Sequence, residues 1–179
     1  MKKEFTIRDV KLEDGPQIIQ NYYGYFEELK RDPGFGLLLP EKKPSMAGEV
    51  RWFADAYARF LEGKSVFLVA ESDGKAVGVC DVIRKTSGRY QNHVGVVGLA
   101  VAKEYRGFGI GEALMREMIK KSRKKFDILT LGVLINNKGA FALYKKLGFE
   151  LYGTLPDCIK RKGKYFGEHE MYMHLKRRR

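Results

Sequence analysis

Three glycines at alternate positions, Gly107, Gly109 and Gly111, mark the stretch of this sequence best suited to hold a ligand. An apolar run ends at Val101 before them and a helical pattern follows them, so we expect a turn between a strand and a helix. Without Cβ atoms, such a turn can curve closely around a ligand and point its N–H groups inward. The start of the helix adds free N–H donors and the positive end of its dipole. The segment therefore predicts an anion site, and a phosphate suits it best.

Two common phosphate-binding loops do not fit this segment. A Walker loop needs Lys and then Ser or Thr directly after its last glycine, whereas Glu112 and Ala113 follow Gly111 here. A dinucleotide fingerprint has the spacing G-x-G-x-x-G, with an acidic residue about twenty positions later. This sequence has G-x-G-x-G, and residues 129–131 contain no acid. The Walker assignment therefore fails and the dinucleotide fingerprint is only a weak match, while an ordinary strand-to-helix turn stays open as an alternative.

The elements that must position this turn follow from hydrophobic periodicity and from turn residues. A hairpin with the turn Ser72-Asp73-Gly74 is followed by a third strand without an intervening helix, which favours an antiparallel meander. Asp14 is a candidate cap of the first helix. We expect strands at 5–8, 65–71, 75–83, 93–101, 126–134, 149–155 and 168–175, helices at 12–29, 46–61, from 109 onward and at 137–147, and loops at 33–44, 84–92 and 160–167.

Two runs of residues resemble one known superfamily. Arg106, Gly109 and Gly111 fit the pattern Arg or Gln, two residues, Gly, one residue, Gly or Ala, and so resemble the pyrophosphate loop of the GCN5-related N-acetyltransferases (GNAT). Residues 137–149, NKGAFALYKKLGF, are similar to the superfamily's other characteristic run, although alone they would indicate only an amphipathic helix. The resemblance is strong over residues 66–149 and topological before them. The end of the chain is loosely similar to branches that act on ribosomal-protein amino termini or small amino compounds.

The resemblance implies a fold and a cosubstrate. The fold is α+β, with a mixed, mostly antiparallel sheet of six to seven strands flanked by about four helices. Strands 93–101 and 128–134 would separate beyond their shared edge, and the pantetheine arm of acetyl-CoA would insert there. Its amides would bond to the backbone near Leu99 and Val101, and backbone N–H groups near Leu99 and Ala100 would face the oxyanion. No metal is implied.

The resemblance also implies roles for side chains. Tyr144 would give a proton to the leaving thiolate, for which a phenol with a pKa near 10 is suitable, although simple packing is its alternative. Arg106 would add charge beside the pyrophosphate, and Asn137 would help to position the cofactor arm. The pyrophosphate itself would be held by the turn and the start of the helix, at Gly107, Phe108, Gly109, Ile110, Gly111 and Glu112.

The general base is the open part of this mechanism. Many members of the superfamily carry a Glu on the strand before the loop, but residues 93–101 contain none. His93 is a candidate because its unperturbed pKa suits proton uptake. A histidine at the start of a strand is more often an edge residue, so a water relay, or no dedicated base, is favoured.

Composition sets the remaining expectations. With 179 residues, 44% of them apolar, the chain is expected to form a single domain over residues 1–179. The formal charge of +12 is interpreted as solvation and attraction of a phosphorylated cofactor, in preference to nucleic-acid binding. The sequence predicts no membrane segment, and Cys80 and Cys158 match no metal or redox spacing, so a cytoplasmic location is expected.

These observations favour an enzyme that transfers an acetyl group from acetyl-CoA to a primary amine, by direct attack in a ternary complex. The acceptor stays open between a small amino compound and a peptide amino terminus, and homodimer formation stays open as well. The alternatives are a CoA-binding regulatory or interaction module without turnover, and a nucleic-acid-binding protein that uses its basic tail.

Overall fold

The computed structural model describes residues 3–85 and 90–176, which contain one mixed sheet of seven strands and four α-helices in the expected order. The strands lie in the order β1-β2-β3-β4-β5-β7-β6, and all neighbours are antiparallel except β4 and β5. The hairpin predicted around residues 72–74 is confirmed as β2 and β3. The strands are β1 (Thr6–Asp9), β2 (Val66–Ser72), β3 (Lys75–Arg84), β4 (Val94–Val101), β5 (Ile128–Leu134), β6 (Glu150–Arg161) and β7 (Lys164–His174).

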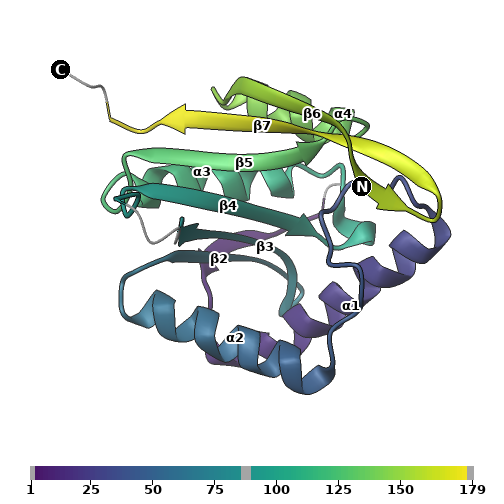
Figure 1. Ribbon diagram of the computed structural model, residues 1–179. Coiled ribbons are helices and arrows are strands. Elements are labelled where there is room, and N and C mark those ends of the chain that lie inside the picture. Colours follow the sequence, from purple (N-terminus) through teal and green to yellow (C-terminus); the bar gives the residue numbers. More distant parts are fainter. Residues whose placement is uncertain (1–2, 86–89, 177–179) are drawn as a thin grey trace.

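The helices lie on both faces of the sheet (Figure 1). Helices α1 (Gly15–Arg31) and α2 (Met46–Leu61) pack on one face, against β3 and β2. Helices α3 (Ile110–Ser122) and α4 (Lys138–Lys146) lie on the other. None of the helices in the described ranges is long and apolar enough to cross a membrane.

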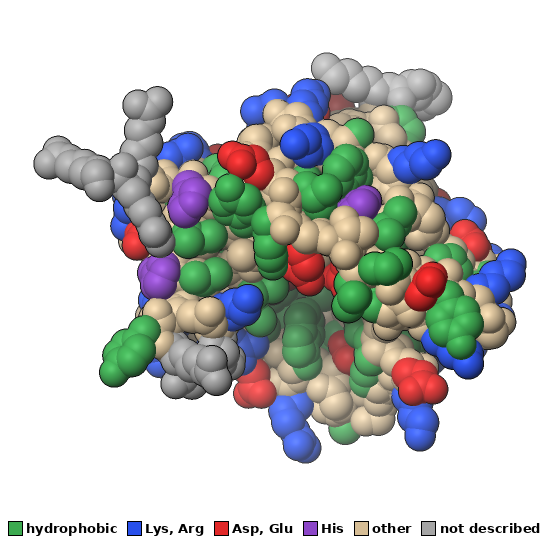
Figure 2. Space-filling model, turned by 45° about the horizontal axis from the view of Figure 1, so that its top comes forward, with side chains coloured by type: hydrophobic (Ala, Val, Ile, Leu, Met, Phe, Trp, Pro, Cys, Tyr) green, Lys and Arg blue, Asp and Glu red, His purple; other side chains and the backbone are tan. Residues whose placement is uncertain are grey.

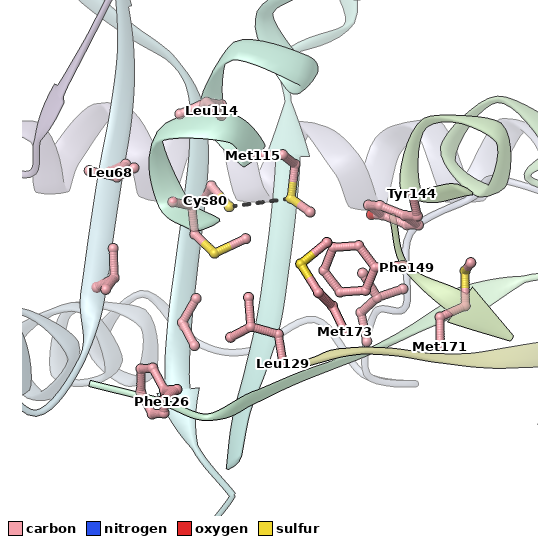
Figure 3. Close-up of a cluster of buried hydrophobic side chains, with 14 of the residues drawn as sticks. Leu68, Cys80, Leu114, Met115, Phe126, Leu129, Tyr144, Phe149, Met171 and Met173 are labelled. Carbon is pink, nitrogen blue, oxygen red and sulfur yellow. Dashed lines mark hydrogen bonds between the residues drawn. The ribbon is translucent and has the colours of Figure 1, made fainter. Parts of the chain in front are cut away.

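Strands β2 and β3 form the centre of the core because both of their faces are covered. Successive side chains point to opposite faces of a sheet. Leu68 and Cys80 therefore pack with α3, whereas Phe67 and Val79 pack with α1 and α2. Figure 3 shows the larger of these two clusters, in which Cys80 Sγ lies 3.8 Å from Met115 Sδ. The two clusters therefore hold β2 and β3 between helices on both faces, and β4 is paired with β3 beside them.

The sheet opens between β4 and β5. These parallel strands pair only where residues 94–96 of β4 meet residues 128–130 of β5. Beyond this point β4 stays paired with β3 as far as Val101, and β5 stays paired with β7 as far as Leu134. Each strand thus follows its outer neighbour, and the backbone of residues 97–101 has an edge without a strand partner. Backbone N–H and C=O groups at such an edge need another partner.

Two expectations from the sequence were wrong in detail. Residues 160–167 are not a loop, because β6 and β7 run on to a two-residue turn at Lys162 and Gly163. Both turn residues have positive φ, 48° and 76°, the combination that closes a tight hairpin. Asp14 does not cap α1 through its side chain, since its carboxylate accepts a bond from the Lys11 amide at 2.7 Å and pairs with Arg8.

Candidate active site

A groove of about 690 Å³ lies where β4 and β5 separate, and we call it the β4–β5 groove. It is lined by Tyr144 and by every predicted cofactor-binding residue except Phe108. The opening between the strands therefore brings together two runs that are about thirty residues apart in sequence. The walls come from residues 35–38, 97–101, 105–107, 109–112, 132–133 and from the α4 segment that starts at 137.

The glycine turn leaves backbone donors free at one end of this groove. Gly107 and Gly109 have φ values of 82° and 84°, and no atom lies within 4 Å of the position a Cβ would take at either residue. Gly109 caps α3 without a side-chain bond, and the first bond within the helix runs from the Ala113 amide to Gly109 O at 3.0 Å. The amides of residues 110–112 are thus available to a ligand. Gly111, in contrast, is an ordinary helical residue. The arrangement fits a pyrophosphate.

Glu112 places a carboxylate in the first turn of α3, close to the predicted anion site. Its charge is balanced by Lys146 at 2.7 Å and by Arg116 at 2.8 Å. Hydrogen bonds from Lys146 and Arg116 lower the pKa of Glu112. Glu112 therefore holds the side chains of Lys146 and Arg116 beside the turn. Their positive charges offset its negative charge, so an anion can still bind there.

The Arg106 guanidinium lies at the groove but is not a free charge. It makes two bonds of 2.7 Å to the Glu28 carboxylate, and its Nε donates to Val101 O at 2.9 Å. It also lies 5.2 Å from the centre of the Phe35 ring. The residue thus ties the glycine turn to α1, a role that the sequence did not predict, and its contact with the pyrophosphate stays a prediction.

Asn137 joins two walls of the groove. Its Oδ1 accepts a bond from the Ala140 amide at 3.2 Å, which caps α4, and its Nδ2 donates to Gly36 O at 3.1 Å. The side chain thereby holds the loop after α1 against the start of α4. Direct positioning of the cofactor arm by Asn137 stays a prediction.

Tyr144 lies in the last turn of α4 and is only 7% exposed. Its ring centre is 5.9 Å from that of Phe149 (Figure 3), and within the described ranges its hydroxyl has no hydrogen-bond partner. Burial, together with the nearby Cys80 thiol, raises the pKa of Tyr144 above its usual value. The hydroxyl therefore keeps its proton at neutral pH and can donate it into the groove.

His93 is not brought to the groove. It is exposed and precedes β4, where its backbone oxygen accepts a bond of 2.8 Å from the Asp127 amide. Leu99 is six residues farther along an extended strand, or about 20 Å away at the usual rise per residue. The structure thus places His93 outside the groove, at the end of β4 away from the open edge, so its role as a base stays a prediction that this position does not support.

A second cavity of about 260 Å³ lies on the other face of the sheet, beneath α1 and α2, and we call it the α1–α2 pocket. It shares Leu37, Leu38 and residues 98–100 with the β4–β5 groove, so the two cavities meet at the open edge of β4. Its remaining walls are mostly aromatic and aliphatic, with one carboxylate from Asp81. The view in Figure 2 shows a hollow near the middle of the molecule, with hydrophobic and acidic side chains around it and most Lys and Arg farther out.

Sequence reasoning missed Asp81. The available signal was an acid within the apolar strand KAVGVCDVIR, where a charged residue on a covered face needs a reason. The exact lining of the pocket gave no signal, because its walls come from five separate parts of the chain.

Comparisons with known proteins agree with this geometry. Residues 25–149 match the acetyltransferase (GNAT) family. The chain is 31% identical over 161 residues to an N-alpha-acetyltransferase of Sulfurisphaera tokodaii, a match that covers 83% of this chain and 81% of that one. It is 35% identical over 106 residues to the L-amino acid N-acetyltransferase AaaT of Escherichia coli, covering 58% of this chain and just under two thirds (65%) of the relative.

The fold also matches a solved structure. A GNAT superfamily phosphinothricin acetyltransferase from Sinorhizobium meliloti, in complex with acetyl-CoA, superposes with a TM-score of 0.80 at 20% identity, covering 95% of this chain and 88% of that one. At this identity the match establishes the fold alone. The family match over most of the chain and the relative from Sulfurisphaera tokodaii go further than the fold. The chain belongs to the acetyltransferase (GNAT) family.

Proposed function

We propose that this protein transfers the acetyl group of acetyl-CoA to a primary amine, by direct attack while both are bound. The observation that carries this proposal is the meeting of two cavities at the open edge of β4. One cavity has free backbone donors for a phosphorylated cosubstrate, and the other has mostly apolar walls and a carboxylate for an amine. Residues 98–100, together with Leu37 and Leu38, border both, so the two substrates can meet there.

The β4–β5 groove would hold acetyl-CoA mainly through backbone groups. The unpaired edge of residues 97–101 supplies N–H and C=O groups for the amides of the pantetheine arm. Gly107, Gly109 and the amides of residues 110–112 bind the pyrophosphate. This chain needs few charged side chains for the task, since backbone donors and the helix dipole supply most of the attraction.

The chemistry needs donors for the oxyanion and a proton for sulfur. Backbone N–H groups near Leu99 and Ala100 lie where the two cavities meet, and they are our candidates for the oxyanion donors. The Tyr144 hydroxyl protonates the leaving thiolate from the α4 side of the sheet. The phenol is protonated at neutral pH and so carries the proton that the thiolate needs, although burial raises the pKa of Tyr144 and makes it a weaker acid than an exposed tyrosine.

The acceptor is a small amino compound or a peptide amino terminus, and relatives with names of both kinds support this range. We place the reaction in the cytoplasm. Two free thiols, buried Cys80 and exposed Cys158, support a reducing compartment.

The test separates an enzyme from a CoA-binding module without turnover. Titration calorimetry measures the binding of CoA and acetyl-CoA, and release of free thiol is followed with a panel of amines and peptides. We expect binding and thiol release with at least one acceptor. Binding without release from any acceptor supports the module, and no binding to the folded protein removes both functions.

A further inference from the structure

Asp81 lines the α1–α2 pocket, and among the residues that the structure describes it has no ion-pair partner. It is partly buried on β3, directly opposite Gly98 of β4. A methyl group at Gly98 would lie 2.5 Å from Asp81 Oδ1, so the glycine makes room for the carboxylate beside the open edge. Within the described ranges no other residue's side chain bonds to this carboxylate. A carboxylate held this way is costly to bury unless a ligand compensates it.

The walls around Asp81 suit a ligand that has an ammonium group next to an apolar side chain. In the described part of the chain the pocket lining contains no Lys, Arg or His, whereas Tyr22, Tyr25 and Trp52 contribute aromatic faces. Aromatic faces attract ammonium groups and pack against apolar side chains. A free amino acid carries a carboxylate next to its amine. In this pocket that carboxylate would lie near Asp81 with no cation among the described lining residues to balance the two negative charges, so a free amino acid fits less well than a peptide.

We propose that Asp81 receives the ammonium group of the acceptor and takes its proton, and that the acceptor is a peptide amino terminus beginning with an apolar residue. This inference rests on the proposed function. Asp81 is then the general base on the α1–α2 face of the sheet, and Tyr144 is the general acid on the opposite face. Asp81 lines the α1–α2 pocket and Tyr144 lines the β4–β5 groove, with residues 98–100 common to both.

Protonation equilibria favour an α-amine over a lysine side chain. Burial raises the pKa of Asp81 to about 6, against a smaller lowering by its own backbone amide and by Arg59. The pKa of a peptide α-amino group is about 7.7–8.0 and that of a lysine about 10.4. The proton transfer is therefore uphill by about two units for the terminus and by more than four for lysine.

The proposed step balances. The ammonium group gives one proton to Asp81, which later releases it to water, and the freed lone pair forms the C–N bond. The C–S bond breaks with its electron pair on sulfur, which takes the Tyr144 proton. The second proton that the nitrogen loses restores the Tyr144 hydroxyl. No oxidant, metal or further reactant is needed.

The first experiment compares Asp81→Asn with Asp55→Asn, an exposed acid on α2. We expect Asp81→Asn to lower kcat at least a hundredfold with a peptide of apolar amino terminus, while calorimetry gives an unchanged affinity for acetyl-CoA. Asp55→Asn should behave as the unmodified protein. Wild-type turnover in Asp81→Asn overturns this inference alone, whereas loss of turnover in every form, including the unmodified protein, overturns the proposed function.

The dependence of kcat/KM on pH distinguishes a base from a residue that only supports the structure, because loss of a structural residue would not change the pKa seen in the profile. The charged or titratable groups near Asp81 are Arg59 from α2, Cys80 next to it on β3, and Tyr22 and Tyr25 of α1. In the unmodified protein kcat/KM should rise through about pH 6 to a plateau, as Asp81 ionises while the substrate is still an ammonium ion. In Asp81→Asn it should keep rising until the amine itself loses its proton, near pH 8. Identical profiles contradict the proposal.

The second experiment fixes the acceptor class. Three substrates are compared: a peptide with a free apolar terminus, the same peptide with its terminus blocked and a lysine added, and the free amino acid of the first residue. We expect the highest kcat/KM for the free terminus, by tenfold or more. A preference for the free amino acid or for lysine overturns the assignment.

Glu168 is the carboxylate that would replace Asp81 if the proposal is wrong. It lies on β7 opposite Leu134 of β5, and its side chain reaches over Gly132, so the two acids lie on the strands that flank β4 and β5. Burial, reinforced by Glu170, raises the pKa of Glu168. It does not line the α1–α2 pocket, and we expect Glu168→Gln to keep the acidic limb of the profile near pH 6. Loss of that limb in Glu168→Gln, but not in Asp81→Asn, would transfer the role to Glu168.

Discussion

The two halves of the site are built in different ways. The β4–β5 groove takes most of its lining from two short runs, residues 97–112 and 137–144, and offers mainly backbone groups to a ligand. The α1–α2 pocket is assembled from α1, the following loop, α2, β3 and β4, and offers mainly side chains. The half proposed to bind a constant cosubstrate is therefore local in sequence, and the half proposed to select the acceptor is dispersed.

The difference follows from what each half must recognise. Backbone N–H groups can be presented by few turn geometries, and these need glycine at fixed spacings. Apolar walls can be made by many side chains at many positions, provided that the shape of the pocket is kept. Substitutions should accordingly separate cleanly into those that affect acetyl-CoA and those that affect the acceptor.

The largest effect is expected at the glycine turn. Gly109→Glu introduces strain at a φ of 84°, together with bulk and negative charge at the anion site, and should abolish acetyl-CoA binding in calorimetry. Gly74→Glu is the matched control, because Gly74 also has positive φ, with no atom nearby, but lies in the β2–β3 turn. Both should lose about 1 kcal/mol or more of stability, and only Gly109→Glu should lose binding. Retained affinity in Gly109→Glu would move the anion site elsewhere.

Tyr144→Phe should give the next largest effect. Removal of the proton donor is expected to lower kcat about a hundredfold and to leave the affinity for acetyl-CoA unchanged. Stability should change little because the hydroxyl has no partner among the described residues. Tyr90→Phe, at a fully exposed position, serves as the control. Unchanged turnover in Tyr144→Phe would leave the residue with packing alone.

The acceptor half is probed by Trp52→Ala. The indole is 43% exposed and lines the α1–α2 pocket, so its loss should raise KM for an apolar acceptor about fivefold, since part of an aromatic contact is removed. Acetyl-CoA affinity should not change. Leu61→Ala lies on the same helix, at 66% exposure and outside the pocket, and should leave KM unaltered. An equal rise in both variants would indicate a general disturbance of α2.

The smallest effect is expected where the two halves are joined. Glu28→Gln removes the partner charge of Arg106 and leaves a net positive charge beside the groove. Because such partly exposed pairs contribute about 1 kcal/mol or less, acetyl-CoA affinity should rise two- to threefold, an increase that salt abolishes. Glu27→Gln, which breaks only the exposed pair with Lys30, is the control. Weaker binding in Glu28→Gln would mean that Glu28 holds Arg106 in a productive position.

Sequence patterns predicted residues that line one groove, the β4–β5 groove, because the signals for these residues are local. Glycine spacing, the helical run after it and the Asn-to-Phe run each fall on one element, and the structure brings them together as expected. His93 was a candidate because of its chemistry, although the sequence already placed it at the start of the strand that became β4, at the end away from Leu99. The hairpin tip was taken for a loop because its residues are basic and polar, although two turn residues are enough to close it.

The sequence by itself determined the order of the elements, the glycine turn before α3 and the tyrosine near the end of α4, since these depend on short-range periodicity and on backbone conformations open to few residues. The separation of β4 and β5 was expected only from the superfamily resemblance, and the tertiary structure alone decided that Arg106 pairs with Glu28 and that Asp81 stands opposite Gly98. These features depend on which strands are neighbours and in what register, and strand pairing joins residues too far apart for local patterns to record.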